Sequence, residues 1–312
     1  MNLKISFIII NYNTLALTVR CINSVKRFSD FDYEIIVVDN GSADESVSGL
    51  KSSFADVKVI ENRENIGFAG ACNKGFNKSE GALVCFLNSD AELSASIKPL
   101  VKFMRADNSA AVCGARLINP DGSEQNSFGK TPDFITEIIN KSLLKKVFPE
   151  KYEGKAFLRK EPFEVETLIG AFMLVKREAF DDLGGFDERY FFFFEESDFC
   201  RRVRENGLKI FIFPGVNVLH LQGKSAGEAL LKARIEYYIS RYSYFDKYYG
   251  FSGKILLCFA LGFLLFVRSM LYFILNIITV FAVREFKQKL VMSSGILVWH
   301  FFGLRKNWGI DK

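Results

Sequence analysis

Carboxylate and amide side chains follow several apolar runs of this sequence, where strands of an α/β sheet would end. Residues 84–87 form one such run, and Asn88, Ser89 and Asp90 come directly after it. Ligands of open α/β sheets bind at the carboxyl ends of the strands, and hard divalent cations take oxygen ligands. Asp90 is therefore a candidate for holding a divalent cation against a diphosphate. The alternative is a strand that runs into a polar turn.

Three carboxylates follow four consecutive phenylalanines. Residues 191–194 are all Phe, and Glu195, Glu196 and Asp198 come next. An apolar wall raises the pKa of a nearby carboxyl group, and neighbouring carboxylates raise it further. Such a group suits a general base near neutral pH. An acid-rich helix start, which the helix dipole favours, is the alternative explanation.

Three more side chains can have either a functional or a structural role. Asp39 ends the apolar run 33–38, where a carboxylate can accept hydrogen bonds from a nucleoside or cap a helix. Tyr12 follows the run 5–10 and can stack on a base or pack in the core. His220, one of two histidines, lies on an expected strand as a metal ligand or a structural residue.

Apolar runs and helix-like segments alternate along the chain, which predicts a mostly parallel sheet with helices on both faces. Thr14 is expected to cap the first helix, and Ser42 with Glu45 to form a capping box for the second. Between residues 123 and 162 the pattern weakens. Strands are expected at 5–10, 33–38, 57–60, 83–87, 110–117, 165–175, 209–213 and 216–221, and helices at 14–27, from 42, at 97–105 and at 198–206.

Composition describes a foldable protein with a basic C-terminal tail. The 312 residues are 49% hydrophobic and 25% charged. Residues 254–312 carry a formal charge of +6 and the remainder −1, which argues against a nucleic-acid-binding body. The six cysteines form no Cys-x-x-Cys pair, so free thiols in a reducing compartment are expected. The run 5–10 is too short for a signal peptide, and we expect the catalytic part to be cytosolic.

The tail is apolar but interrupted. Residues 255–267 and 270–283 are mostly apolar, with Arg268 and Ser269 between them. A charged residue at mid-membrane is costly, so an interfacial helix or a re-entrant hairpin is favoured over one straight span. A buried helical pair at a homo-oligomer interface is the alternative. Arg268, Tyr272, Asn276 and Thr279 have helical spacing along one stripe, and Arg284, Lys287 and Lys289 are expected to meet cytoplasmic headgroups.

The motifs together resemble glycosyltransferase family 2, especially its rhamnosyltransferase-like branch of bacterial polysaccharide and O-antigen synthesis. The resemblance covers roughly residues 3–225 and implies a GT-A fold and inverting transfer from a nucleotide-sugar with Mn or Mg. It rests on residues 7–13, 36–42, 65–69, 87–90, 184–188 and 194–198 and on His220.

The resemblance also implies roles for individual residues. Glu196 matches the family's base, with Glu195 and Asp198 beside it as catalytic candidates, and Asp90 and His220 match metal-binding positions. Asn88 stands where the strict metal motif has Asp, which implies weaker metal coordination, and Glu196 stands where Asp is commoner. Gly170 and Asp187 are expected on the acceptor side. Donor binding is expected from Asn11, Tyr12, Asn13, Asp39, Gly41, Asn65, Gly67, Phe68, Asn73, Asn88 and Ser89.

These expectations combine into one functional hypothesis. Residues 1–225 are the GT-A catalytic domain, 226–253 a linking amphipathic helix and 254–312 a membrane-associating segment. The enzyme is expected to move rhamnose from dTDP-rhamnose to a hydroxyl of a lipid-linked saccharide at the cytoplasmic face of the bacterial plasma membrane. A UDP-sugar donor, or a catalytically silent nucleotide-sugar-binding protein, is the alternative. No Gly-x-Gly-x-x-Gly follows the first run, which disfavours a dinucleotide oxidoreductase.

Overall fold

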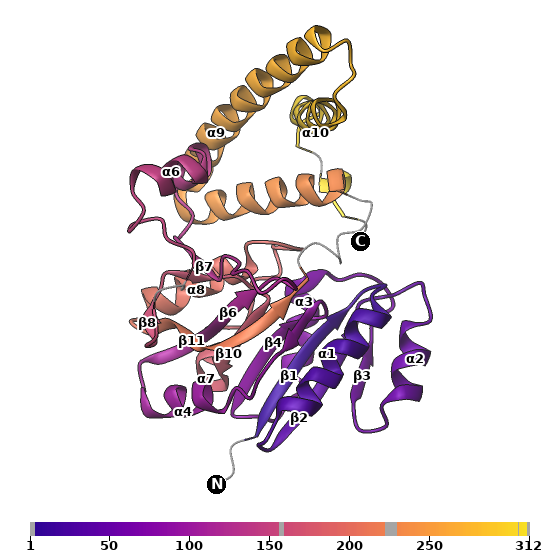
Figure 1. The fold of residues 1–312 in the computed structure, drawn as a ribbon, viewed down its shortest axis with the longest axis vertical. Helices are drawn as coiled ribbons and strands as arrows, with labels where there is room; N and C mark the ends of the chain where they lie inside the picture. The colour runs from indigo at the N-terminus through magenta and orange to yellow at the C-terminus, as the bar shows by residue number, and fades with distance from the viewer. Residues whose placement is uncertain (1–3, 156–158, 222–229, 305, 311–312) are drawn as a thin grey trace.

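A nine-stranded sheet with helices on both faces forms the larger part of the molecule, and a group of C-terminal helices stands beyond one end of it (Figure 1). The computed structural model describes residues 4–155, 159–221, 230–304 and 306–310. Residues 226–229 of the expected linker therefore lie outside the described residues.

The strand order is β3-β2-β1-β4-β10-β6-β11-β5, with β8 paired to β11. Most strands run in one direction, and β5, β8 and β10 run against it, β10 lying between β4 and β6. The α/β sheet is thus confirmed, as a mixed rather than a purely parallel one. The strands are β1 Ile5–Asn11, β2 Tyr33–Asp39, β3 Lys58–Glu61, β4 Leu83–Asn88, β5 Ala91–Leu93, β6 Ala110–Ile118, β8 Phe163–Glu164, β10 Phe172–Lys176 and β11 Lys209–His220; β7 Phe128–Gly129 and β9 Thr167–Leu168 form a separate pair.

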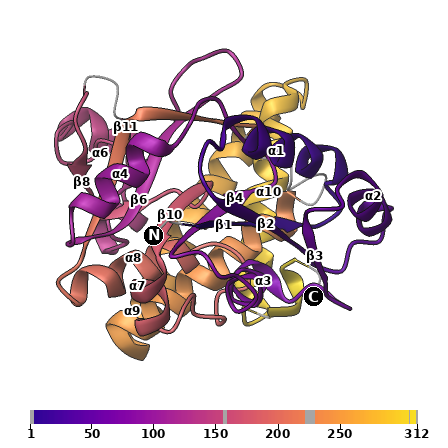
Figure 2. The ribbon, with the colours of Figure 1, turned by 90° about the horizontal axis from the view of Figure 1, so that it is seen from below.

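Side-chain alternation along the central strands fills a core on each face of the sheet. In β1, Phe7 and Ile9 join one buried cluster while Ile8 joins the other. Helices α1, α2 and α4 cover the first face, and α3, α7 and α8 cover the second (Figure 2). The helices are α1 Leu15–Phe28, α2 Ser46–Ser53, α3 Gly67–Phe76, α4 Lys98–Ala106, α5 Phe134–Ile138, α6 Lys141–Val147, α7 Arg177–Asp182 and α8 Glu195–Glu205.

Both expected caps at the first two helices are wrong. Thr14 occupies the N-cap position of α1, but its hydroxyl donates to Asn11 Oδ1 at 3.1 Å instead of capping. Ser42 donates to Asp39 Oδ2 at 2.7 Å, and α2 begins only at Ser46. In both cases a buried polar group at a strand end competes successfully for the hydroxyl.

Two strand predictions also differ from the structure. The expected strand 165–175 is divided into β9 and β10, which belong to different sheets. The two short strands expected at 209–213 and 216–221 form the single strand β11, with a shift in its register against β6 between Phe213 and Asn217. The six cysteines are unpaired, as expected.

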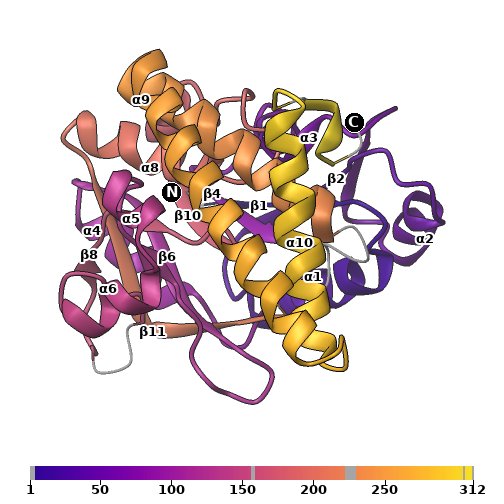
Figure 3. The same cartoon turned by 90° about the horizontal axis from the view of Figure 1, so that it is seen from above.

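The C-terminal part is built from α9 Leu230–Ile278, α10 Arg284–Phe301 and the short helix η1 Lys306–Trp308. Helix α9 bends at Gly250, whose φ of 70° is non-helical, so it has a lower leg (residues 230–249) and an upper leg (residues 251–278). The upper leg and α10 lie side by side as a helical hairpin (Figures 1 and 3). In the described part of the chain, α9 is the one helix long and apolar enough to cross a membrane, and 22% of its most apolar stretch is buried.

An aromatic cluster joins these helices to the α/β part of the molecule. Trp299 of α10 is buried and stacks on Tyr242 of the lower leg, while Phe194 packs against Tyr244. The outer face of the hairpin is apolar and exposed. Its exposed side chains include Phe251, Leu256, Phe259, Phe263, Phe266, Met270, Phe273, Ile277, Val280, Val291 and Phe301.

Candidate active site

A first cavity, of about 190 Å³, opens at the carboxyl ends of β1 and β4. Its walls come from the turns after these strands, the N-terminus of α3 and the phenylalanine run (residues 191–194). This is the crevice in which open α/β sheets bind ligands. Seven residues predicted for the donor and the metal line it together: Tyr12, Asn65, Gly67, Phe68, Asn88, Ser89 and Asp90.

Other predicted donor-binding residues do not line this cavity. Asn11 and Asp39 are buried and bound to each other, with Asn11 Nδ2 donating to Asp39 Oδ2 at 2.7 Å. The Ser42 backbone N–H donates to Asp39 Oδ1 at 2.9 Å. Asn13, in the left-handed region at φ 53°, accepts a hydrogen bond from the Ala43 backbone. These contacts tie the loop after β1 to the loop after β2.

Gly41 and Asn73 also hold the framework. A Cβ on Gly41 would lie 2.8 Å from the backbone of Glu64, so only glycine fits there. Asn73, on α3, donates to the Phe186 carbonyl and accepts from its N–H, both at 2.9 Å. The amide of Asn73 is thus engaged with the turn before the phenylalanine run, and its donor-binding role stays a prediction.

Asp90 and His220 face each other at the edge of the first cavity. His220 Nε2 lies 3.5 Å from Asp90 Oδ1, and both side chains are buried. His220 Nδ1 lies 2.9 Å from Gln125 Oε1, an acceptor-only oxygen, so the Nδ1 proton points to Gln125. This leaves the Nε2 lone pair toward Asp90 in the neutral ring. Two electron-pair donors that face each other suit a cation between them, and a fixed second nitrogen is typical of metal-binding histidines.

The donor set fits a divalent metal with an open coordination sphere. Within the described residues no group of three or more His, Cys, Asp or Glu side chains gathers, and Asp90 and His220 are the two candidate ligands at this place. Asn88, on the same cavity wall, offers an amide oxygen in place of a carboxylate. Mn and Mg accept such oxygen-rich sets and keep positions for water and phosphate oxygens.

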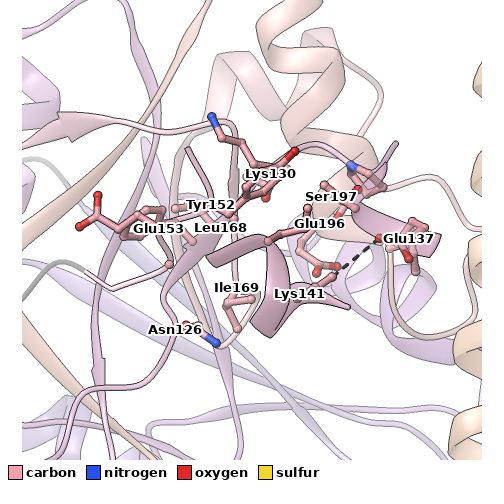
Figure 4. Close-up of a pocket in the computed structure, with 18 of the residues that line it drawn as sticks. Asn126, Lys130, Glu137, Lys141, Tyr152, Glu153, Leu168, Ile169, Glu196 and Ser197 are labelled. Atoms are coloured by element: carbon pink, nitrogen blue, oxygen red, sulfur yellow. Dashed lines mark ion pairs between the residues drawn. The ribbon is translucent and has the colours of Figure 1, made fainter. Parts of the chain in front are cut away.

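A second cavity, of about 460 Å³, contains Glu196 (Figure 4). It lies between α5, α6, β9 and the start of α8, and Lys130, Lys141, Lys145 and Tyr152 also line it. A Cβ on Gly170 would lie 3.7 Å from Cβ and Cγ of Glu196, so Gly170 leaves the Glu196 side chain uncovered on that side. The structure thus brings Gly170 and Glu196 together.

Glu195 and Glu196 are destabilised as carboxylates. Burial raises the pKa of Glu195 well above its ordinary range, and the charge of Glu196 raises it further. Burial also raises the pKa of Glu196, opposed by backbone N–H groups and by Lys141. Glu195 lines neither cavity and is almost fully buried, whereas Glu196 is half-buried and opens on the second one. Glu196 is therefore the carboxylate that a substrate can reach.

The phenylalanine run contributes to both cavities. Phe191 and Phe192 line the first, and Phe193 and Phe194 line the second. Phe193 and Phe194 have φ values of 70° and 72°, a conformation that costs a non-glycine residue on the order of 1–3 kcal/mol. Both rings pack against Tyr237 of α9, and this packing stabilises the strained conformation. The turn that results allows one short segment to line both cavities.

Comparison with known proteins identifies the family. The family model described as glycosyl transferase family 2 matches residues 6–184. The chain belongs to glycosyltransferase family 2. A second model, described as the N-terminal domain of galactosyltransferase, matches residues 156–223. The resemblance inferred from the motifs is confirmed.

Relatives of this family 2 chain include rhamnosyltransferases. It is 28% identical over 224 residues to the N-acetylglucosaminyl-diphospho-decaprenol L-rhamnosyltransferase of Mycobacterium tuberculosis, covering 67% of this chain and 73% of that one. It is 23% identical over 235 residues to the dTDP-rhamnosyl transferase of Shigella flexneri, covering 72% and 71%. The mannosyltransferase of Pyrobaculum calidifontis, solved with GDP-Man and Mn2+, shares the fold with a TM-score of 0.55 at 16% identity, over 97% of this chain and 88% of that one.

The third catalytic candidate of this family 2 enzyme, Asp198, has a structural role. Its side chain is fully buried and both oxygens are engaged: Oδ2 accepts from Arg202 at 2.8 Å, and Oδ1 accepts from Lys247 at 2.5 Å and Tyr248 at 2.9 Å. It lines neither cavity. Asp198 therefore ties α8 to α9 through its ion pairs, and its catalytic role stays a prediction.

Asp187, predicted on the acceptor side, belongs to the same network. Its Oδ2 accepts from Lys247 and Arg189, each at 2.8 Å, and it does not line the second cavity. These ion pairs connect the turn before the phenylalanine run and the start of α8 to the lower leg of α9. Asp187 thus has an anchoring role in the structure, and its place on the acceptor side stays a prediction.

Several residues that line the two cavities were not predicted from the sequence. Ala233 and Ile310 close one side of the first cavity, although both come from the C-terminal region. Lys141 and Lys145 reach the second cavity from α6, in the segment where the sequence pattern is weak. Their i, i+4 spacing was visible, but nothing in the sequence placed α6 beside Glu196.

Proposed function

We propose that this family 2 enzyme is an inverting transferase that moves rhamnose from dTDP-rhamnose to a hydroxyl of a lipid-linked saccharide. The observation that carries the proposal is the pair of cavities to which the phenylalanine run contributes. One is lined by Asp90, which His220 contacts from behind the cavity wall, and the other is lined by Glu196, a carboxylate of raised pKa. A nucleotide-sugar diphosphate suits the first cavity and an acceptor hydroxyl the second.

The protein's part in the reaction follows from these positions. Glu196 lines the second cavity, and its carboxylate takes the proton of the acceptor hydroxyl. The hydroxyl oxygen forms a bond to the anomeric carbon as the bond from that carbon to the diphosphate oxygen breaks. The bonding electron pair leaves with the nucleoside diphosphate. Attack from the side opposite the leaving group inverts the anomeric centre.

Asp90 and His220 would hold a divalent Mn or Mg beside the diphosphate. When bound, the ion supplies positive charge that stabilises the leaving group. Gln125 keeps the His220 ring in the orientation that presents Nε2 to the ion. Because Asn88 is a weaker ligand than a carboxylate, we expect millimolar rather than micromolar metal to be required.

The choice of substrates rests on the relatives. Two of them are named for rhamnosyl transfer, one with a dTDP-linked donor and one with a diphospho-decaprenol acceptor. The exposed apolar hairpin and the tail charge of +6 suit attachment to the cytoplasmic leaflet, where a lipid-linked acceptor is presented. A non-processive enzyme of cell-surface polysaccharide or O-antigen synthesis fits these features.

A donor screen tests the substrate proposal. Detergent-solubilised protein with Mn is incubated with a lipid-linked saccharide and each of dTDP-rhamnose, UDP-glucose, UDP-galactose and GDP-mannose, and the product is analysed by mass spectrometry and NMR. We expect turnover with dTDP-rhamnose and an inverted anomeric centre in the product. Turnover with UDP-sugars alone rejects the donor assignment, and tight donor binding without any product supports a silent binding protein.

A further inference from the structure

The second cavity contains lysine side chains that the proposed reaction does not use. Lys130, Lys141 and Lys145 line it, the last two from α6. Lys130 is neutralised by Glu166, whose Oε1 lies 2.7 Å away. Lys141 lies 3.7 Å from Glu137, a long contact drawn in Figure 4. Glu137 is itself shared with Arg241, at 2.8 Å.

Lys145 stands out because its charge is not compensated. Its Nζ donates to the amide oxygen of Asn126 at 2.8 Å and, within the described residues, lies in no ion pair. Burial lowers the pKa of Lys145, and the charges of Lys155 and Lys141 lower it further. A half-buried ammonium with two cationic neighbours is an unfavourable arrangement that a bound anion would relieve.

Lys141 and Lys145 both line the same cavity as the proposed base, and Lys141 interacts with it. Lys141 acts on the carboxyl group of Glu196, whose pKa it lowers, so the two side chains share an electrostatic environment. An anion held by Lys141 and Lys145 would therefore lie within the same cavity as the hydroxyl that Glu196 deprotonates (Figure 4).

Helix α6 also presents an apolar side to solvent. Leu143, Val147 and Phe148, on α6 and at its end, are 53%, 56% and 54% exposed. Figure 1 shows α6 beyond the same end of the sheet as the helical hairpin. Lysines toward a cavity and apolar residues toward solvent suit an amphiphile, with an anionic head and an apolar chain.

We propose that Lys145 and Lys141, with Asn126, form a subsite for the diphosphate that links the acceptor saccharide to its lipid. This inference rests on the proposed function, because it assigns the acceptor to the second cavity. The diphosphate oxygens accept charge-assisted hydrogen bonds from the two ammonium groups, which are stronger than neutral ones. The lipid chain leaves along Leu143, Val147 and Phe148, and the saccharide extends toward Glu196.

The test compares two acceptors that differ in one group. One carries the saccharide on a short prenyl diphosphate, and the other carries the same saccharide on a neutral alkyl chain of equal length. Lys145→Gln should raise the KM for the diphosphate acceptor at least about 10-fold more than the KM for the neutral one, since a charged hydrogen bond is lost. Lys146→Gln, an exposed lysine on the same helix that does not line the cavity, should change neither. Lys145→Arg should restore the preference.

A binding measurement separates this subsite from the reaction. A short prenyl diphosphate without sugar is titrated calorimetrically into the solubilised wild type, Lys145→Gln and Lys146→Gln. Weaker binding in Lys145→Gln alone supports the subsite, even if no sugar transfer is found and the proposed function fails. Equal binding in all three, or transfer with an unchanged acceptor preference in Lys145→Gln, overturns it. If Lys145→Gln weakens binding to phosphatidylglycerol vesicles as much as it weakens binding to the prenyl diphosphate, the lysines bind lipid headgroups in general. That result also overturns the proposed subsite.

Discussion

His220 Nε2 lies 3.5 Å from Asp90 Oδ1, and this contact is made by strand pairing between distant parts of the chain. Ala91 of β5 is the antiparallel partner of His220 of β11, so Asp90 and His220 are fixed side by side at the edge of the sheet. The Leu221 backbone N–H also donates to the Asp90 carbonyl at 2.9 Å. The pairing of the two side chains is therefore part of the fold, independent of any ligand.

From this contact we predict that Asp90→Ala and His220→Ala each weaken metal-dependent binding of a nucleoside diphosphate. Loss of a metal ligand removes a charged or strongly coordinating group, and we expect affinity in Mn to fall on the order of 10–100-fold. Calorimetry of dTDP with Mn and with EDTA measures the effect. If the affinity of His220→Ala for dTDP differs between Mn and EDTA as much as that of wild type does, His220 is a structural residue.

Glu195 is predicted to lower the stability of the folded protein at neutral pH. Because burial raises its pKa above the ordinary value of 4.5, the folded state keeps a proton that the unfolded chain has lost. Stability conferred by this group is therefore fully present below pH 4.5 and falls as the pH rises toward the raised pKa. Glu195→Gln should raise the melting temperature at pH 7 to 8 and have little effect near pH 4.

Thermal unfolding across this pH range checks the Glu195 prediction. Glu45→Gln, an exposed glutamate, is the matched control and should leave the melting temperature unchanged at every pH. If Glu195→Gln raises the melting temperature by the same amount at pH 4 and at pH 8, the buried carboxylate is not the cause of the stabilisation.

Asp198 is predicted to be required for stability rather than for chemistry. It holds Arg202, Lys247 and Tyr248 together, and removing one partner of a buried ion pair costs about 3–5 kcal/mol. Asp198→Asn should lower the melting temperature, and its activity per folded molecule, measured at low temperature, should stay within a few-fold of wild type. Loss of activity with an unchanged melting temperature would return Asp198 to the catalytic group.

The hairpin is predicted to hold the enzyme on membranes. Phe259 and Phe263 are 75% and 66% exposed on the upper leg of α9, and their apolar surface suits the lipid interface. Replacing both by Asp should move the protein from the membrane pellet to the soluble fraction. Lys102→Glu changes the net charge equally on an exposed position of α4 and should leave the protein in the pellet. Pelleting of both variants would favour a buried oligomer contact instead.

The features that depend on local sequence pattern, namely the strands and the polar residues at their ends, could be predicted from the sequence. The apolar runs located β1, β2 and β4, and several polar residues after β1 and β4, among them Tyr12 and Asp90, line one cavity. This worked because the carboxyl ends of neighbouring parallel strands meet at one edge of a sheet. The antiparallel direction of β10 was not predicted, because the apolar pattern of a short buried strand is the same for parallel and antiparallel pairing.

Roles set by distant partners could not be predicted. Asp198 resembles a catalytic acid in sequence, but Lys247 and Tyr248, which engage it, lie about fifty positions further along the chain. Lys145 lies in a segment without clear periodicity, and its place in the second cavity depends on how α6 packs. In both cases the environment of the side chain is created by tertiary contacts.

The role of Glu196 as the base of the glycosyl transfer is tested by comparing wild type with a variant that lacks the carboxylate. Transfer of rhamnose from dTDP-rhamnose to a lipid-linked saccharide is measured for wild type and Glu196→Gln, with dTDP-rhamnose affinity determined on the same preparations. Loss of a general base should lower kcat about 10²–10⁴-fold, while donor affinity stays within a few-fold because Glu196 does not line the first cavity. Unchanged kcat in a folded Glu196→Gln enzyme would contradict the account.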